Sequence, residues 1–152
     1  MYSNEKRIKA VLAAYLVLFR DGKVLLSQRA NTGYYDGYFG LVSGHVEGKE
    51  TFTEALIREA FEEAGIQLKF QDLETCHFMH RYEDLNPTGS KVRVDVFILA
   101  RSWRNEIINR EPEKCSLLDW FNLNDLPEKT IPYIKSAINC IRAKKRYSEY
   151  GF

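Results

Sequence analysis

The sequence predicts an α/β fold in which a mixed sheet lies between helices. Several short segments carry apolar residues either continuously or in alternation, which is typical of strands, and two longer segments carry helical signals. Turn signals join these segments in the order hairpin, helix, hairpin, strand, helix. The length of 152 residues suits one domain, so we expect residues 1–152 to fold as a single unit.

The first predicted element is a strand over residues 8–19. Both alternating sets of its side chains are apolar, so both of its faces should be covered. Asp21-Gly22 favours a tight hairpin turn, and residues 23–30 form the returning strand. The Gly- and Tyr-rich residues 31–40 predict a loop, and a short strand at about residues 39–43 leads to the glycine that follows.

A helix is predicted over residues 51–64. Thr51 and Glu54 have the spacing of a capping box, in which the hydroxyl and the carboxylate each accept a hydrogen bond from a backbone amide. Gly65 suits the left-handed conformation with which many helices end. Both ends of this helix are therefore marked in the sequence.

The second half of the chain predicts three strands and one helix. Residues 74–82 and 91–101 alternate like strands on either side of a turn at residues 86–89, and residues 117–123 predict a further short strand. Residues 131–146 predict an amphipathic helix. Its apolar residues at helical spacing are Ile134, Ala137, Ile138 and Ile141.

Composition excludes several classes of protein. Lys and Arg number 22 and Asp and Glu 21, so the net charge of +1 gives no reason to expect a nucleic-acid or membrane partner. No apolar run is long enough for a membrane-spanning helix. The 3 cysteines are widely spaced and form no CxxC pair, which argues against a disulfide framework or a structural zinc site and favours a reducing cytoplasm.

Acidic residues concentrate between Gly44 and Ile66. Glu59, Glu62 and Glu63 are spaced i, i+3 and i+4, so they share one face of the predicted helix. Neighbouring carboxylates repel one another, and a divalent cation with oxygen ligands would compensate that repulsion. Carboxylates without clustered His or Cys favour Mg²⁺ or Mn²⁺ over Zn²⁺. The alternative is a solvated acidic face with no ligand.

The complete spacing of this segment resembles the signature of the Nudix (MutT-like) hydrolase family. The matching positions are Gly44, Glu50, Arg58, Glu59, Glu62, Glu63, Gly65 and Ile66. Ala60 stands where the family usually has a larger aliphatic residue, and Val42-Ser43 stands where relatives often have Pro-Gly. The resemblance implies an α/β/α sandwich, with a mixed central sheet, that carries the motif as a loop, a helix and a loop.

The resemblance also implies an activity and its cofactor. Family members generally hydrolyse a nucleoside diphosphate linked to another group, so we expect a metal-dependent hydrolase that cleaves a phosphoanhydride bond. Carried over by position, the Gly44 carbonyl, Glu59, Glu62 and Glu63 are the expected ligands of Mg²⁺ or Mn²⁺. The partner is then a small nucleotide, and because relatives are often dimeric, a homodimer remains open.

Three further residues are candidates for the catalytic site. In relatives a glutamate at the position of Glu59 can act as the base, although this role migrates within the family. Arg58 lies one turn before Glu62 and can orient a carboxylate, the alternative being a plain surface ion pair. Glu111, in a distal loop, is a candidate for an extra ligand or base, or an exposed glutamate with no role.

Candidates for holding the rest of the substrate are aromatic and basic. Tyr34 and Tyr35 could stack on a nucleobase, or pack beneath their own loop. Arg29 and Arg81 end two predicted strands and could each bind a phosphate, the alternative being a solvated arginine. Arg93 and Asp95 lie on one face of a predicted strand, where they line the open side of the sheet or, more simply, form an internal ion pair.

Two alternative functions stay open. Tyr82 follows the motif at about the distance at which dinucleoside polyphosphate hydrolases of this superfamily carry a tyrosine. A nucleotide-sensing module without turnover would share the fold, but its expected mark is a broken motif. Here every charged position of the motif is present.

Overall fold

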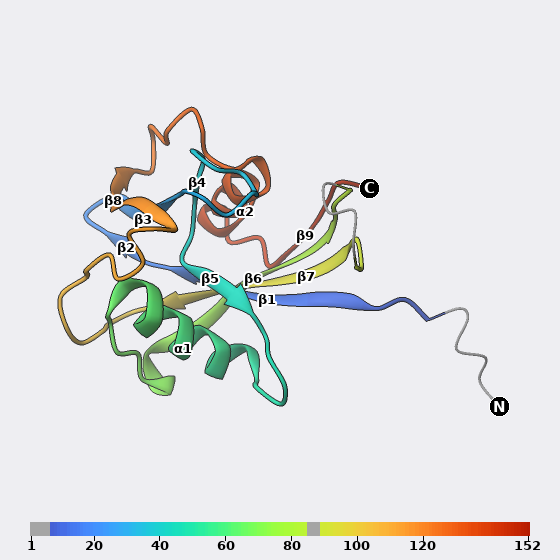
Figure 1. Cartoon of the computed structure of the whole chain (residues 1–152), viewed down its shortest axis with the longest axis horizontal. Helices are drawn as coiled ribbons and strands as arrows, with labels where there is room; N and C mark the ends of the chain where they lie inside the picture. Colours follow the sequence, from blue (N-terminus) through green and yellow to red (C-terminus); the bar gives the residue numbers. More distant parts are fainter. Residues whose placement is uncertain (1–6, 85–88) are drawn as a thin grey trace.

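The structure is a computed structural model that describes residues 7–84 and 89–152. It contains two sheets and two α-helices, arranged as Figure 1 shows. In chain order the elements are β1 (Ala10–Val17), β2 (Phe19–Arg20), β3 (Lys23–Arg29), β4 (Phe39–Gly40), β5 (Ser43–His45), α1 (Phe52–Ala64), the 3₁₀ turn η2 (Phe70–Asp72), β6 (Leu73–Tyr82), β7 (Val92–Ala100), β8 (Cys115–Asn122), α2 (Pro132–Arg142) and β9 (Tyr147–Tyr150).

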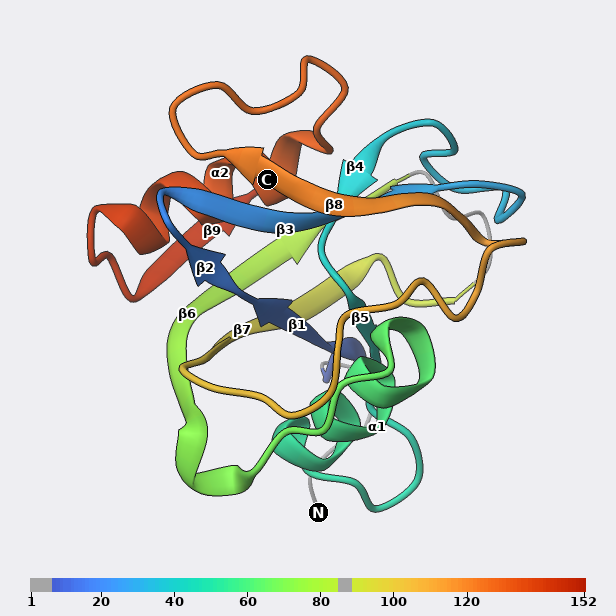
Figure 2. The ribbon, with the colours of Figure 1, turned by 90° about the vertical axis from the view of Figure 1, so that its left-hand side faces the viewer.

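The larger sheet is mixed and has the strand order β5-β1-β7-β6-β9. β1 runs parallel to β7 and β6 parallel to β9, whereas β5 and β7 run antiparallel to β1 and β6 respectively. In the smaller sheet β3 pairs antiparallel with β2, β4 and β8. Figure 2 shows β8 and β3 side by side above the larger sheet.

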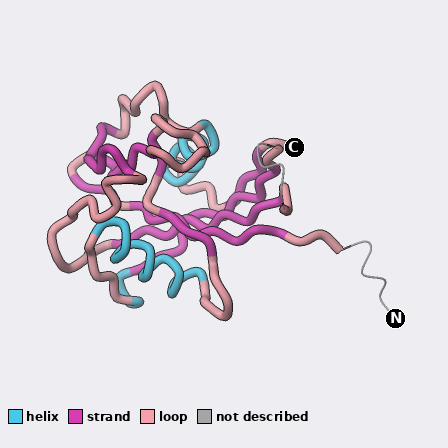
Figure 3. Tube along the Cα trace, viewed as in Figure 1, coloured by secondary structure: helices cyan, strands magenta, loops and turns pink. Residues whose placement is uncertain are grey.

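The helices cover opposite faces of the larger sheet (Figure 3). Because strand side chains alternate, Ala14 and Leu16 pack toward α1, whereas Tyr15 and Val17 pack into the core that contains α2. This explains why both alternating sets of β1 are apolar. The expected α/β/α arrangement with a mixed central sheet is confirmed.

Helix α1 begins and ends where its sequence predicts. The Thr51 side chain accepts from the Glu54 amide, the Glu54 side chain accepts from the Thr51 amide, and Gly65 closes the helix in the left-handed region at φ 69°. Between these caps the helix buries its small and apolar face through Ala55, Leu56, Ala60 and Ala64. The acidic face is consequently turned toward the cleft described below.

Two predicted elements have different bounds in the structure. The single strand expected at residues 39–43 is two: β4 belongs to the smaller sheet and β5 to the larger, so the chain changes sheets between them. The helix expected to reach residue 146 ends at Arg142, because the chain turns at Lys144 (φ 56°) and forms β9. The turn expected at residues 86–89 falls largely on residues 85–88, outside the described residues.

The structure also shows the state of the cysteines and the character of the helices. Cys76, Cys115 and Cys140 are all free thiols. Across residues 7–84 and 89–152, no helix combines the length and the apolar character that crossing a membrane requires.

Candidate active site

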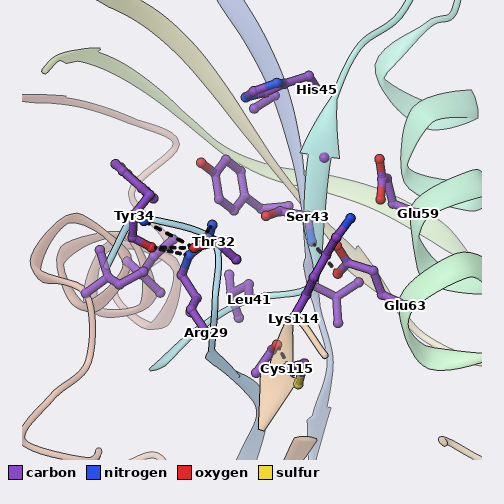
Figure 4. Close-up of a pocket in the computed structure, with 18 of the residues that line it drawn as sticks. Arg29, Thr32, Tyr34, Leu41, Ser43, His45, Glu59, Glu63, Lys114 and Cys115 are labelled. Carbon is purple, nitrogen blue, oxygen red and sulfur yellow. Dashed lines mark hydrogen bonds between the residues drawn. The ribbon is translucent and has the colours of Figure 1, made fainter. Parts of the chain in front are cut away.

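A cleft of about 710 Å³ lies between the larger sheet, α1 and the loop over residues 31–38. Its acidic end is lined by Glu59, Glu62 and Glu63 of α1, together with Glu111. Figure 4 shows Glu59 and Glu63 on one side of the cleft and Arg29, Thr32 and Tyr34 on the other. The volume is that of a small-molecule site.

Gly44 and Glu59 lie in direct contact at this acidic end. A Cβ atom built on Gly44 would overlap Oε1 of Glu59, so only glycine leaves room for the carboxylate against the backbone of β5. The Glu59 side chain is 13% exposed. The first motif glycine and the first of the clustered motif glutamates therefore meet in space, although 15 positions separate them in the chain.

Arg58 orients the glutamates around it. Its Nε lies 2.6 Å from Glu50 Oε1, and its Nη1 lies 2.7 Å from Glu59 Oε1 and 3.4 Å from Glu62 Oε2. Nη2 donates to the His45 carbonyl at 3.2 Å. The hydrogen bonds to Glu50 and Glu59 raise the pKa of Arg58 above its usual range. Arg58 therefore contacts Glu50 before the helix, Glu59 on the helix and the backbone of β5. A plain surface ion pair would have only one of these partners.

The environment of Glu63 strongly disfavours the ionised form of its carboxylate. Burial, followed by the charges of Glu59 and Glu111, raises the pKa of Glu63 to about 8, while Oε2 accepts from the Ser43 amide at 3.3 Å. Burial also raises the pKa of Glu59, although its hydrogen bond to Arg58 acts in the opposite direction. The cleft thus holds acidic groups that lack enough positive charge.

The donor set at this end fits a hard divalent cation. The Gly44 backbone and the carboxylates of Glu59, Glu62, Glu63 and Glu111 line one cleft, and Mg²⁺ or Mn²⁺ prefers such oxygen ligands. Within the part of the chain that the structure describes, no three acidic, His or Cys side chains converge tightly enough to form a complete ligand set. Arg58 holds two of the carboxylates instead, so metal binding requires these side chains to rotate.

Glu111 arrives from a distant part of the chain. It lines the cleft from the loop before β8, and its charge contributes to the raised pKa values of Glu59 and Glu63. The loop is fixed locally, because the Glu111 carbonyl accepts from the amides of Lys114 and Cys115 and its own amide donates to Asn109 Oδ1. The sequence candidate therefore lies beside the motif glutamates.

The wall opposite the glutamates carries Arg29 and Tyr34. Nε of Arg29 donates to the Tyr34 carbonyl at 2.7 Å and Nη2 to the Thr32 hydroxyl at 3.2 Å. The Tyr34 hydroxyl donates to Glu83, and burial is the main reason that the pKa of Tyr34 is raised. Tyr35 does not line the cleft; its ring packs edge-on against Tyr34, Tyr38 and Tyr133.

Arg81 reaches the cleft wall with two carboxylates and an aromatic ring around its guanidinium. It is 1% exposed, its Nε lies 2.6 Å from Asp95 Oδ2, its Nη1 lies 3.1 Å from Glu83 Oε2, and its guanidinium lies 3.7 Å from the centre of the Tyr133 ring. It is therefore not a solvated arginine. The internal ion pair expected between Arg93 and Asp95 is instead formed by Arg81 and Asp95.

The register of β6 and β7 explains this exchange of partners. Asp95 lies opposite Met79, and Arg81 lies opposite Arg93, so Arg81 is the diagonal neighbour of Asp95 on the same sheet face. Arg93 pairs with Glu83, its Nε lying 3.0 Å from Glu83 Oε2. Only the pairing of the two strands decides which carboxylate each arginine meets.

Sequence reasoning missed several residues of the cleft. No pattern in the sequence points to Lys114, Ser43 or Tyr133 as lining residues, and Lys114 points into the cleft in Figure 4. Glu83 does not line the cleft, but it contacts Tyr34, Arg81 and Arg93, which do. The position of Glu83, two residues after Arg81, was a usable signal, because residues two apart share a strand face. Tyr82 is not among the lining residues and packs against Phe152.

Comparisons with known proteins agree on one family. The family model described as "NUDIX domain" matches residues 9–139. An ADP-ribose pyrophosphatase of Methanocaldococcus jannaschii is 30% identical over 131 residues, which is 84% of this chain and 71% of the relative. An 8-oxo-dGTP diphosphatase of Proteus vulgaris is 28% identical over 107 residues, 68% of this chain and 86% of the relative.

Solved structures give the same result. A MutT NUDIX hydrolase from Burkholderia pseudomallei superposes with a TM-score of 0.77 at 26% identity, covering 87% of this chain and 98% of that one. The NUDIX domain of Shewanella oneidensis NrtR complexed with ADP ribose has a TM-score of 0.69 at 21% identity, covering 94% and 93%, which shows the shared fold alone.

Fold, motif and cleft thus agree with one class of enzyme, the Nudix hydrolases. The chain belongs to the Nudix hydrolase family, whose similar members are named as pyrophosphatases or diphosphatases of nucleotides.

Proposed function

We propose that this protein is a metal-dependent hydrolase that cleaves a phosphoanhydride bond in a nucleoside di- or triphosphate, or a derivative of one, by attack of water at phosphorus. The observation that carries the proposal is the meeting of Gly44, Glu59, Glu63 and Glu111 in one cleft, where burial and mutual repulsion raise carboxylate pKa values. Such a cluster is expected where a cation binds, because a cation would stabilise the ionised form of carboxylates that are buried and that repel one another.

The proposed metal ligands are the Gly44 carbonyl, Glu59, Glu62 and Glu63. Divalent cations, when bound there, supply the positive charge that a polyphosphate needs before an anionic or polar nucleophile can approach it. Glu62 is the most exposed of the three side chains at 49%, and it can turn into the cleft without breaking core packing. Arg58 holds Glu59 by an ion pair of 2.7 Å, and the Glu59 side chain would rotate from this position to bind a cation.

The proposed base is Glu59, with Glu111 as the alternative. A carboxylate that takes a proton from water must lie close to the reacting phosphorus and keep a pKa within reach of neutral pH. Burial raises the pKa of Glu59 in that direction, while the hydrogen bond and the charge of Arg58 act to lower it. Glu111 faces the same space from the loop before β8.

The opposite wall would hold the rest of the nucleotide. Arg29 and Tyr34 line it, and the guanidinium of Arg29 lies 5.2 Å from the centre of the Tyr34 ring. An aromatic ring can stack on a base, and an arginine can pair with a phosphate. The ring of Tyr35 packs edge-on against Tyr34, and Arg81 forms part of the wall beside Asp95 and Glu83.

The cysteines bear on the cellular compartment. Three free thiols fit a reducing cytoplasm, so we propose that the enzyme acts there on free nucleotides. We further propose that residues 1–152 form one domain, because the segment matched by the NUDIX model spans most of the chain.

The test is a panel of substrates incubated with Mg²⁺. The panel contains the common nucleoside triphosphates, 8-oxo-dGTP, ADP-ribose and a dinucleoside polyphosphate, and the products are separated as pyrophosphate, phosphate or nucleoside monophosphate. We expect turnover of at least one compound with cleavage within the phosphate chain. ADP-ribose belongs in the panel because a relative 30% identical to this chain is named for it.

Two variants and a chelator complete the design. Glu62→Gln should remove most turnover without changing the fold, whereas Glu128→Gln, on an exposed residue away from the cleft, should leave the rate unchanged. EDTA should stop the reaction. Full activity in chelator, or an unchanged rate for Glu62→Gln at saturating Mg²⁺, contradicts the proposed metal role.

A further inference from the structure

The end of the cleft remote from the glutamates has its own polar chemistry. We call it the arginine end and define it by Tyr34, Arg81, Arg93 and Tyr133, all of which line the cleft. Arg81 and Arg93 are cross-strand neighbours on β6 and β7, and Tyr34 covers them from the loop over residues 31–38 through its hydrogen bond to Glu83. The two arginines are 1% and 8% exposed, so this end is a built site rather than a surface patch.

Arg93 differs from Arg81 in what its guanidinium contacts. The donors of Arg81 face two carboxylates, those of Asp95 and Glu83, whereas Arg93 pairs with Glu83 alone, its Nε lying 3.0 Å from Glu83 Oε2. That Nε is buried, and its approach to Glu83 lacks the alignment of a hydrogen bond. Among residues 7–84 and 89–152, the two terminal nitrogens of Arg93 donate no hydrogen bond, and they are not among the fully buried polar atoms.

The terminal donors of Arg93 are open to a ligand. They are not among the buried atoms without a partner, so an acceptor that enters the cleft can replace the water around them and gain the free energy of a charge-assisted hydrogen bond. Because Arg93 lines the cleft and its side chain is 10% exposed, the open side of its guanidinium faces the cleft. The acceptor is therefore expected to belong to the substrate.

The charge balance shows which part of the substrate this is. Arg81 and Arg93 are matched by Glu83 and Asp95, so the arginine end has no excess positive charge for a further phosphate. Tyr34 adds an aromatic ring beside the neutralised cluster. A flat, uncharged group with hydrogen-bond acceptors on its edge fits this combination, and the nucleobase is the part of a nucleotide with those properties.

We propose that Arg93 selects the nucleobase, and that it favours guanine over adenine. A guanidinium presents two parallel donors, and guanine offers two adjacent acceptors, O6 and N7, that match them. Adenine places an amino donor where guanine has O6, so two donors would face each other. This proposal rests on the proposed nucleotide hydrolase function and names the base that its cleft prefers.

The proposal is tested by binding of nucleoside monophosphates, which contain no phosphoanhydride bond to cleave. Dissociation constants of GMP and AMP are measured by NMR titration of ¹⁵N-labelled protein, in which the Arg93 Nε–H resonance reports contact directly. GMP should bind roughly 10- to 100-fold more tightly than AMP, the range expected for a bidentate arginine–guanine contact. The Arg93 resonance should shift with GMP and not with AMP.

A variant and a modified ligand isolate the contact. Arg93→Lys keeps the charge that Glu83 needs but loses the two parallel donors, so the preference for GMP should disappear. Arg101→Lys, on an exposed arginine elsewhere, is the matched control and should keep the preference. With the wild-type protein, 7-deaza-GMP lacks the N7 acceptor and should bind more weakly than GMP, whereas IMP keeps both acceptors and should not; this arm needs no variant to fold.

The outcomes separate the two proposals. Equal affinity for GMP and AMP, a preference unchanged in Arg93→Lys, or no binding of either nucleotide up to its solubility overturns the role of Arg93. A guanine preference without hydrolysis of any compound in the substrate panel supports the base site and overturns the proposed hydrolase function. Hydrolysis without a base preference supports the proposed hydrolase function and overturns the proposed role of Arg93.

Discussion

Glu59 and Glu63 lie one turn apart on α1, yet different neighbours control them. Arg58 pairs with Glu59, whereas Glu63 has only the Ser43 amide as a hydrogen-bond donor among the described residues. The carboxylate with the positive partner is the better candidate for a base that must be ionised, and the buried one without such a partner is the better candidate for a group that a cation would discharge.

A first prediction at this scale concerns the base. Glu59→Gln keeps the size and hydrogen-bonding shape of the side chain but cannot accept a proton, so kcat should fall roughly 100-fold or more. The measurement is kcat at saturating substrate and Mg²⁺, with Glu111→Gln compared in parallel. If the Glu59 variant keeps its rate and the Glu111 variant loses it, the base is Glu111.

A second prediction uses the raised pKa of Glu63. With a pKa of about 8 in the folded protein and 4.5 as the ordinary value, the folded state binds the extra proton between these pH values. Stability without metal should therefore fall as pH rises from about 5 to 8. Glu63→Gln cannot ionise, so in EDTA its melting temperature should exceed that of the wild type at pH 9 by at least about 2–4 °C, the shift for about 1 kcal/mol in a domain of this size.

The control for this prediction is Glu128→Gln, an exposed residue whose substitution should leave the pH profile of melting unchanged. Parallel profiles for the wild type and Glu63→Gln would show that burial of Glu63 does not oppose its ionisation. The Mg²⁺ arm of the same experiment should reduce the difference, because a bound cation favours the ionised carboxylate.

At the scale of single elements, β9 depends on one histidine of β6. His77 is fully buried, its Nδ1 lies 2.6 Å from the Lys145 carbonyl, and its Nε2 lies 2.7 Å from the Ser148 hydroxyl. Nδ1 therefore carries a hydrogen, because a carbonyl oxygen only accepts, and in the neutral ring Nε2 accepts from the Ser148 hydroxyl. These contacts join the end of the α2 segment to the sheet.

This arrangement makes the attachment of β9 sensitive to acid. Burial lowers the pKa of His77 below its ordinary value of 6.5, so the unfolded chain takes up the proton first as pH falls. Stability present above about pH 6.5 should be lost as pH falls through the lowered pKa. His77→Gln is neutral at every pH, so its melting temperature should depend less on pH between 7 and 5 than that of the wild type, whereas His80→Gln should keep the wild-type dependence.

Other elements gain their role from what they bring together. Helix α1 supplies the carboxylates, β5 supplies the backbone against which Glu59 rests, and the loop before β8 supplies Glu111. Because β5 is only three residues long and pairs with β1, its position depends on the larger sheet rather than on its own propensity.

At the scale of the whole molecule, the cleft draws on both sheets and both helices. Its lining includes Ser27 of the smaller sheet, Tyr15 of the larger one, Glu63 of α1 and Tyr133 of α2. A ligand bound in this cleft would contact both sheets and both helices. Binding should therefore raise the free energy of unfolding of the entire domain rather than that of one element.

The corresponding prediction is a ligand-dependent melting temperature. A non-hydrolysable nucleotide triphosphate with Mg²⁺, at about 100 times its Kd, should raise the melting temperature by roughly 5–10 °C through mass action. The measurement is a thermal melt at increasing ligand concentration, which should saturate. An unchanged melting temperature, or the same rise in EDTA, would contradict metal-assisted binding in this cleft.

The sequence alone was sufficient for features that depend on neighbouring residues. The capping box at Thr51, the left-handed Gly65 and the acidic face of α1 follow from local backbone and side-chain chemistry, and the structure has all three. The apolar patterns likewise predicted most strands. A strand that is covered on both faces is apolar at successive positions, and a strand that is covered on one face alternates between apolar and polar residues.

Features that depend on which distant segments meet were decided only by the tertiary structure. The pairing of Arg81 rather than Arg93 with Asp95 follows from the register of β6 against β7, and β9 exists because β6 offers it an edge and the His77 contacts. For the same reason, only the tertiary structure shows that Lys114 lines the cleft and that Glu83 holds Tyr34 at its wall. Local patterns specify elements, whereas the free energy that selects these pairings comes from packing between residues far apart in the chain, which no local pattern encodes.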